Sequence, residues 1–222
     1  MKKQIAIAID GPAAAGKSTI AKLIANSLSF TYIDTGAMYR AFTWAVLEQG
    51  LDPQNIDQAC SLIGEITIFL SKDNEVFVND VNVTRKIREP HVSGNVSYIA
   101  SYKPIRLALV EQQRSLAAHH SVVMDGRDIG TYVLPEAEVK IFLVASVETR
   151  ALRRYKENIE KGIDVPLEDI RKELEKRDYI DSHRDFAPLR QAEDAILLDT
   201  SEMSIDEVVA TVAKIVKTKV GL

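Results

Sequence analysis

Short apolar runs alternate along the chain with longer stretches in which apolar residues recur every three to four positions. The short runs are typical of buried strands, and the longer stretches are typical of amphipathic helices. Strands are predicted at 4–10, 30–34, 121–125, 139–144 and 195–199. Helices are predicted at about 17–28, 36–49, 104–118, 146–160, 166–184 and 204–218. This alternation favours an α/β fold in which helices cover both faces of a parallel sheet.

One segment departs from the alternation. Its apolar runs lie at 66–70, 75–78 and 81–83. They are joined by Asp73-Asn74 and Asn79-Asp80, which are turn residues at hairpin spacing. We therefore predict an inserted subdomain with a small antiparallel sheet at 60–100, and the alternative is a long decorated loop. The core would then consist of 1–59 and 101–222, with a lid around 150–185.

The first predicted strand runs directly into a glycine-rich sequence with the pattern G-x-x-x-x-G-K-S. Its residues are Gly11, Pro12, Ala13, Ala14, Ala15, Gly16, Lys17, Ser18 and Thr19. Between a strand and a helix, this pattern wraps its backbone N–H groups around the β-phosphate of a nucleotide. Lys17 would reach the β- and γ-phosphate oxygens, and the Ser18 hydroxyl would bind Mg²⁺. The alternative is a glycine-rich turn that merely joins strand to helix.

The apolar strand at 121–125 ends in an acid, Asp125, which Gly126, Arg127 and Asp128 follow. In proteins with a phosphate-binding loop, a strand-ending acid of this kind holds Mg²⁺ directly or through water. Gly126 allows close approach of the backbone, and the next two side chains would face the crevice. The alternative is a simple strand-ending turn, in which Asp-Gly is common.

A second possible anion site follows the strand at 30–34. Thr35 is placed to cap the next helix, and Arg40 lies about one turn inside it. Arg40 would reach an anion held near the helix start. The alternative is an ordinary surface arginine.

Arginines also gather on two late helices. They are Arg150, Arg153 and Arg154 on the first helix, and Arg177 and Arg184 on the second. Their spacings place each group on one helical face, and Asp181 lies between the last two. The hinge-like segment at 161–166 separates the groups, so we predict a lid that carries arginines over the phosphates. The alternative is a solvated surface with local ion pairs such as Glu173–Arg177.

The composition limits which class of protein this can be and which kinds of partner it can bind. The chain is 46% hydrophobic and 27% charged, as in soluble globular proteins, and its net charge of −4 argues against broad nucleic-acid binding. Cys60 is the only cysteine, which excludes an internal disulfide and a cysteine-based zinc site. Asp10 interrupts the first apolar run, and no stretch approaches the length that crosses a bilayer. We expect a cytoplasmic protein that acts on small molecules, without a membrane or nucleic-acid partner.

Several pieces of the sequence together resemble the bacterial cytidylate (CMP/dCMP) kinases of the nucleoside monophosphate kinase group. The pieces are Ile9–Thr19, Tyr32–Arg40, Asp125–Gly130 and Arg177–Tyr179 with Asp181 and Arg184. The resemblance covers nearly the whole chain. It implies a three-layer P-loop fold with a five-stranded parallel sheet, an inserted NMP-binding subdomain and a short helical lid. It also implies a monomer that transfers the γ-phosphate of ATP to CMP or dCMP with Mg²⁺.

The resemblance further implies roles for individual residues. Ser97, Arg106 and Asp128 would read the cytosine. Arg40 and Arg127 would hold the acceptor phosphate, with Thr35 nearby. Arg177, Asp181 and Arg184 would contact the sugar and the acceptor side, and Arg153 or Arg154 would be a lid arginine. The catalytic set would be Lys17, Arg127, Arg153, Arg154 and Arg184, and the metal ligands Ser18 and Asp125.

The base assignment agrees with the chemistry of cytosine, because a carboxylate such as Asp128 accepts a hydrogen bond from the N4 amine. One departure concerns Ala13, where many members of the family have a serine whose hydroxyl lies near the acceptor phosphate. Two other functions stay open. One is a kinase of the same fold with a different acceptor, and the other is a nucleotide-dependent switch. A GTPase switch would need a guanine-reading Asn-Lys-x-Asp element, which the sequence lacks.

Overall fold

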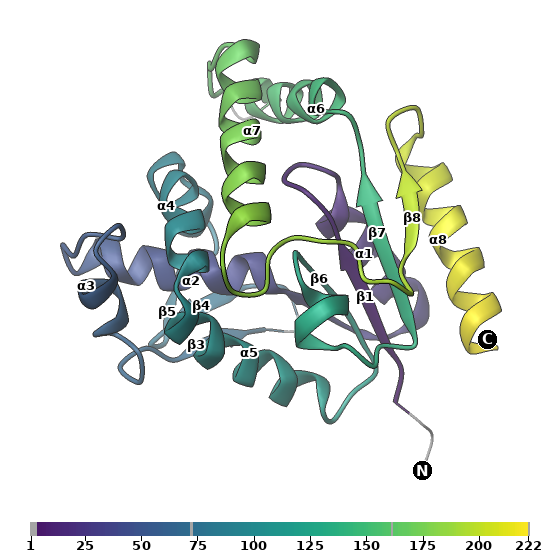
Figure 1. The fold of residues 1–222 in the computed structure, drawn as a ribbon, viewed down its shortest axis with the longest axis horizontal. Coiled ribbons are helices and arrows are strands. Elements are labelled where there is room, and N and C mark those ends of the chain that lie inside the picture. The colour runs from purple at the N-terminus through teal and green to yellow at the C-terminus, as the bar shows by residue number, and fades with distance from the viewer. Residues whose placement is uncertain (1–3, 72, 161, 222) are drawn as a thin grey trace.

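The computed structural model describes residues 4–71, 73–160 and 162–221, and its centre is a five-stranded parallel sheet in the order β2-β6-β1-β7-β8 (Figure 1). The strands are β1 (Ala6–Asp10), β2 (Thr31–Asp34), β6 (Val122–Gly126), β7 (Val139–Val144) and β8 (Ile196–Asp199). Every pair of neighbours in this sheet is parallel. The strand predictions are thus confirmed to within two residues at each end.

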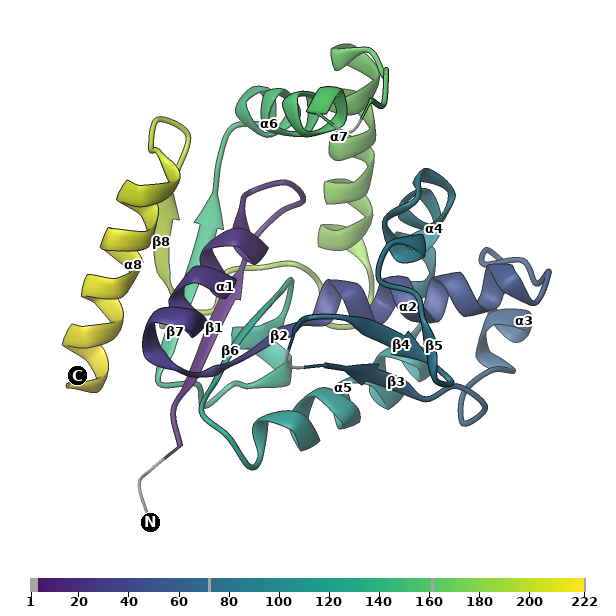
Figure 2. The same cartoon turned by 180° about the vertical axis from the view of Figure 1, so that it is seen from behind.

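Helices cover both faces of the sheet, which confirms the three-layer fold. One face is covered by α1 (Lys17–Leu28) and α8 (Ile205–Val220), and the other by α2 (Thr35–Glu48) and α5 (Lys103–Ala117). Two more of the predicted helices, α6 (Val147–Glu160) and α7 (Leu167–His183), pack against each other and the glycine-rich loop. Alternate residues of β1 enter different cores, because side chains along a strand point to opposite faces. Ile7 and Ile9 pack with α1 and α8, which Figure 2 shows in front of the sheet, whereas Ala8 packs with residues of α2 and α5.

The segment that departs from the alternation forms the predicted small antiparallel sheet, with strands β3 (Ile68–Leu70), β4 (Val76–Val78) and β5 (Val81–Asn82). Its buried Val76 and Val78 pack in one core with α2. The prediction omitted three short elements here: α3 (Ile56–Cys60), the 3₁₀ turn η1 (Lys86–Arg88) and α4 (Pro90–Ser101). Pro90 begins α4 at a position where a missing N–H costs nothing, and Val92, Val96 and Ile99 supply its buried face.

The α6–α7 pair lies beyond the carboxyl ends of β1 and β7, next to the loop at 11–16 (Figure 1). Ala151 of α6 packs with Ile170 and Leu174 of α7. The predicted hinge at 161–166 connects the two helices, and its first residue lies outside the described residues. None of the helices in the described part of the chain is long and apolar enough to cross a membrane.

Candidate active site

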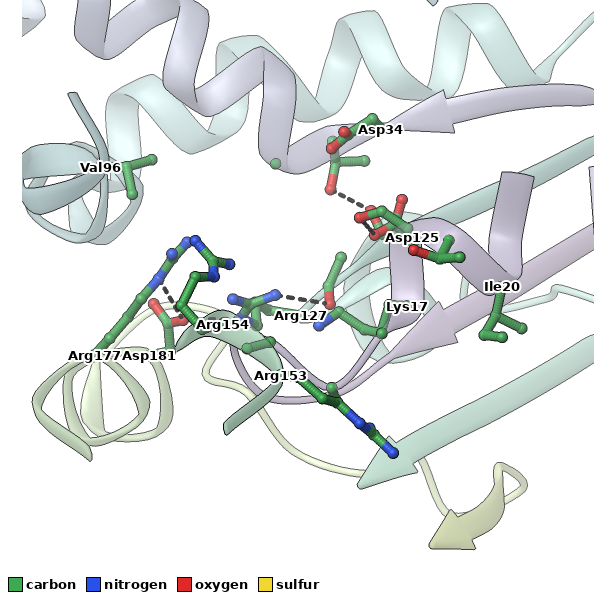
Figure 3. A pocket seen from close by; sticks show the side chains of 18 of the residues that line it. Lys17, Ile20, Asp34, Val96, Asp125, Arg127, Arg153, Arg154, Arg177 and Asp181 are labelled. Carbon is green, nitrogen blue, oxygen red and sulfur yellow. Dashed lines mark hydrogen bonds and ion pairs between the residues drawn. The ribbon is translucent and has the colours of Figure 1, made fainter. Parts of the chain in front are cut away.

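A cavity of about 550 Å³ opens at the carboxyl ends of the central strands, between the glycine-rich loop, α2, α4 and α7 (Figure 3). Its lining is dominated by charge. The basic residues are Lys17, Arg40, Arg88, Arg106, Arg127, Arg153, Arg154, Lys156, Arg177 and Arg184. The acidic residues are Asp34, Asp125, Asp128, Glu157 and Asp181. The structure therefore brings the phosphate-loop lysine, the strand-ending acid and arginines from several helices and loops to one place.

The glycine-rich loop divides into a cavity-lining part and a packed part. Residues 14–19 line the cavity, whereas Gly11, Pro12 and Ala13 do not. Gly11 lies so close to β7 that a Cβ atom would stand 2.0 Å from the Leu143 carbonyl oxygen, which is why only glycine fits. Ala13 is buried against Ala151, Ile170 and Leu174. In this chain position 13 therefore packs against the α6–α7 pair.

Lys17 begins α1 and is buried at the floor of the cavity. Its Nζ donates to the carbonyl oxygen of Pro12 at 2.6 Å. Burial lowers the pKa of Lys17 well below its ordinary value, and the nearby Arg127 guanidinium lowers it further. The ammonium group is thus held by its own loop, in a surrounding that favours the arrival of negative charge.

Asp125 is the hub of a buried polar cluster. Its carboxylate accepts hydrogen bonds from the hydroxyls of Ser18 and Tyr32, each at 2.8 Å, and its carbonyl oxygen accepts one from Thr35 Oγ1 at 2.7 Å. Burial raises the pKa of Asp125 to about 6, and the Asp34 carboxylate contributes to the rise. Tyr32 was not predicted to join this cluster. A signal was available, because residues two apart in a strand point to the same face of the sheet, and Tyr32 and Asp34 are two apart in β2.

Thr35 is not the cap of α2, so that prediction is wrong. The N-cap is Asp34, whose Oδ1 accepts from the backbone N–H of Ala37 at 2.8 Å, while its Oδ2 pairs with Arg88 at 2.7 Å. A carboxylate accepts the free N–H groups at a helix start and also balances the helix dipole. This leaves the Thr35 hydroxyl free to bond Asp125. Arg88 was not predicted for this site, because no local pattern links it to a residue 54 positions earlier.

Asp128 stands between two buried arginines. Arg106 of α5 donates to its Oδ2, and Arg184, just after α7, lies 3.5 Å from its Oδ1. The Arg106 guanidinium lies over the ring of Tyr39, 5.3 Å from the ring centroid. Ser97 of α4 lines the same cavity, and Arg106 donates to the carbonyl oxygen of Ala100 on that helix at 2.9 Å. The trio expected to read a base, Ser97, Arg106 and Asp128, therefore lines one cavity, in which Arg106 contacts both Asp128 and α4.

Asp181 links two further arginines of the lining. Arg127 Nε donates to Asp181 Oδ2 at 2.8 Å, and Arg177 Nε lies 4.0 Å from the same oxygen. Burial alone would raise the pKa of Asp181, but the guanidinium groups outweigh it and hold the pKa below its usual value. Arg177 pairs with Asp181 and not with Glu173, and its side chain is only 18% exposed, so the solvated-surface alternative is wrong here.

The arginines also act on one another. Burial lowers the pKa of Arg40, and the charge of Arg177 lowers it further. Burial likewise lowers the pKa of Arg177 to about 10, with Arg127 as the next cause. Both groups still remain charged at neutral pH. The arginines repel one another, and a bound polyanion would relieve this repulsion and stabilise the protein.

Arg153 and Arg154 of α6 line the cavity, whereas Arg150 does not, so the prediction that the three arginines act as one group is wrong for Arg150. Arg150 is buried and does not line the cavity; its Nη1 donates to the Ala13 carbonyl oxygen at 3.0 Å. Arg153 donates to the carbonyl oxygen of Thr200 at 2.6 Å. Arg154 lies beside Arg177 and Asp181, whereas Arg153 points away from them (Figure 3). Helical spacing sets where side chains leave the helix, but long side chains end where their partners lie.

Asp10, the last residue of β1, anchors the wall that carries Asp128. Its two carboxylate oxygens accept hydrogen bonds from the backbone N–H groups of Ile129 and Gly130, at 2.8 and 2.7 Å. These residues begin η2 (Ile129–Val133), a single π-helical turn. Burial raises the pKa of Asp10 to about 7, against the opposing effect of the two amide bonds. In the sequence, Asp10 stood out only as a residue that interrupts an apolar run, and this anchoring role was not predicted.

We expect the Asp10→Asn variant to flatten the pH dependence of the unfolding free energy. A carboxyl with a pKa of about 7 in the folded state, against an ordinary value of 3.8, binds its proton more tightly when folded. The stability it contributes is therefore full below about pH 4 and is lost as the pH rises to about 7. Urea unfolding of both proteins from pH 4 to 8 measures this, and an identical slope in the variant would contradict it.

Comparison with known proteins agrees with this geometry. The family model described as "Cytidylate kinase" matches residues 7–218. A cytidylate kinase of Oceanobacillus iheyensis is 54% identical over 211 residues, covering 94% of this chain and 92% of the relative. One of Anoxybacillus flavithermus is 53% identical over 223 residues, covering 99% of each. A solved structure of an uncharacterized protein from Eubacterium ventriosum has a similar fold, with a TM-score of 0.51 at 14% identity and coverage of 95% and 97%. The chain belongs to the cytidylate kinase family.

Proposed function

We propose that the protein transfers the γ-phosphate of ATP to CMP or dCMP, giving CDP or dCDP and ADP, in pyrimidine nucleotide metabolism. Membership of the cytidylate kinase family supports this activity. The observation that carries it is one cavity with Lys17 and the phosphate loop on one side and the Arg106–Asp128 wall on the other, with arginines between. That arrangement suits two nucleotides that meet at their phosphates.

The donor binds at the phosphate loop. Residues 14–18 line the cavity at the start of α1, where free backbone N–H groups and the helix dipole favour negative charge. Lys17 leaves its own loop carbonyl to bind the β- and γ-phosphate oxygens. The pyrophosphate part of ATP is thereby fixed before transfer.

The acceptor base binds at the Asp128 wall. The Asp128 carboxylate accepts from the N4 amine of cytosine, and Arg106, with Ser97 beside it, donates toward N3 or O2. Uracil presents a carbonyl oxygen in place of the amine and would leave the carboxylate opposed by an acceptor. Burial of Asp128 makes such a mismatch costly.

The arginines between the two sites serve the phosphates and the sugar. Arg40 and Arg127 hold the acceptor phosphate near the Thr35 hydroxyl, and Arg177, Asp181 and Arg184 contact the sugar side of the acceptor. Arg154 is the lid arginine best placed for the transferred group, since Arg153 bonds Thr200 instead. Such an arginine supplies roughly 10³–10⁵-fold in rate where it neutralises the charge of the moving phosphoryl group.

Ser18 and Asp125 fit a Mg²⁺ site. Their oxygens lie 2.8 Å apart at the edge of the phosphate-binding loop, and hydroxyl and carboxylate oxygens are the ligands that Mg²⁺ prefers. When bound there, the ion would neutralise part of the charge on the donor phosphates. Tyr32 holds the carboxylate in place from the other side.

Substrate profiling tests the proposal. The purified protein is incubated with ATP, Mg²⁺ and one of CMP, dCMP, UMP, AMP, GMP or dTMP, and ADP release is measured, with EDTA in a parallel control. We expect rapid ADP release with CMP and dCMP and none with EDTA. Rapid release with a different acceptor would overturn the cytosine assignment. Release that no acceptor stimulates would overturn the kinase proposal.

A further inference from the structure

We propose that Asp178 and Arg150 are positioning residues for phosphoryl transfer, which act on Lys17 through the Pro12–Ala13 peptide of the phosphate loop. The proposal rests on the proposed kinase function. Neither residue lines the cavity, and neither belongs to the residues proposed to touch the nucleotides or the metal.

The Pro12–Ala13 peptide lies between Lys17 and Asp178. Its carbonyl oxygen accepts from Lys17 Nζ at 2.6 Å, and its N–H group donates to Asp178 Oδ1 at 3.0 Å. A peptide group is planar and rigid, so the two contacts set its orientation together. The carboxylate of α7 therefore determines where the loop presents the carbonyl that holds the lysine.

Arg150 completes the arrangement from α6. Its Nη1 donates both to the carbonyl oxygen of Ala13 and to Asp178 Oδ2, and its Nε donates to the carbonyl oxygen of Ala145, the residue just after β7. The Arg150 side chain is 8% exposed and that of Asp178 is 21% exposed. An ion pair this deeply enclosed keeps its geometry, because water does not compete for its hydrogen bonds.

Packing strengthens the same link. The Ala13 methyl group sits among Ala151, Ile170 and Leu174, in the apolar core of the α6–α7 pair. The tip of the phosphate loop is thus inserted between the two helices. Arg177 precedes Asp178 directly in α7, so the contact that orients the loop also sets the distance between this arginine and Lys17.

This geometry restricts how the predicted lid can move. Helices α6 and α7 are bonded and packed to the phosphate loop, so the pair cannot rotate away from the loop as a free body without breaking two hydrogen bonds and the apolar contact. In the described residues, the segment that joins the two helices makes no hydrogen bond to the loop, although its Val165 packs against the apolar cluster that contains Ala13. The positions of the arginines on α6 and α7 relative to the phosphate loop are therefore already set before the donor phosphates bind.

Kinetics of Asp178→Ala and Asp178→Asn test the proposal. We expect Asp178→Ala to lower kcat roughly 10–100-fold, the size of effect seen when reacting groups are displaced by about 1 Å, with KM for CMP changed less than about twofold. Asp178→Asn keeps an acceptor for the Ala13 N–H and should recover part of the loss. Arg171→Ala is the matched control, because the Arg171 side chain on α7 is 34% exposed and, among the described residues, pairs with Glu168 and Glu175 of its own helix.

A second measurement does not depend on activity. Hydrogen exchange of the backbone at residues 11–17 should be faster in Asp178→Ala than in the wild type and unchanged in Arg171→Ala. The proposal is overturned if the kcat of folded Asp178→Ala stays within twofold of the wild type, or if kcat falls only in proportion to the folded fraction measured by circular dichroism. A wild-type protein without CMP-dependent turnover would instead overturn the proposed function, and the exchange measurement would still report on the peptide contact.

Discussion

Replacing Lys17 with alanine is expected to lower kcat for CMP phosphorylation by on the order of 10³-fold, the size of effect seen when a preorganised donor to a developing charge is removed. Lys17 is the one ammonium group at the start of α1, buried at the floor of the cavity, and its Nζ is already held at 2.6 Å from a loop carbonyl. No other cationic side chain of the phosphate loop can take its place on the β- and γ-phosphates. The loss should therefore appear in kcat more than in KM for CMP.

Coupled measurement of ADP formation at saturating ATP and CMP checks this expectation. Lys22→Ala is a suitable control, because Lys22 lies on the exposed side of the same helix. Thermal unfolding should change little in Lys17→Ala, since burial works against the charged ammonium that the substitution removes. Turnover of Lys17→Ala within tenfold of the wild type would contradict the role of the phosphate loop.

The second large effect is expected for Asp128. Changing Asp128 to asparagine should reduce the preference for CMP over UMP, measured as the ratio of kcat/KM values, by roughly 10–100-fold, the value of a well-placed base contact. An amide offers a donor to the uracil carbonyl and only one acceptor to the cytosine amine. An unchanged ratio would mean that other residues read the base.

Asp128 also balances two buried arginines, Arg106 and Arg184, so its removal affects stability as well. Breaking a buried ion pair by deleting one partner costs about 3–5 kcal/mol. Asp128→Ala is therefore expected to unfold at a lower denaturant concentration than Asp128→Asn, which keeps the size and one acceptor. Asp185→Asn, a change at an exposed acid next to Arg184, controls for the loss of a negative charge. Specificity is compared at a temperature at which all the proteins are folded.

Much of this protein follows from local sequence. The alternation of apolar runs and amphipathic stretches predicted the five central strands and six helices, because each period reports one buried face. The loop at 11–19 and the acid at the end of β6 could be joined into one site from the order of strands and helices alone, since the carboxyl ends of parallel strands meet at one edge of the sheet. These predictions rest on short stretches of sequence and on the order of those stretches along the chain.

What the sequence left undecided depends on contacts between distant residues. Asp128 meets Arg184 across 56 positions, and Arg150 meets Ala13 across 137. Helical periodicity placed Arg150, Arg153 and Arg154 on one face, yet their side chains end at different partners. Arg150 reaches Ala13, Arg153 reaches Thr200, and Arg154 pairs with Glu157. A repeat in the sequence specifies the direction in which a side chain leaves its helix. The atoms that a long, flexible side chain finally reaches are decided by the packing of the whole fold, which brings the partners into place.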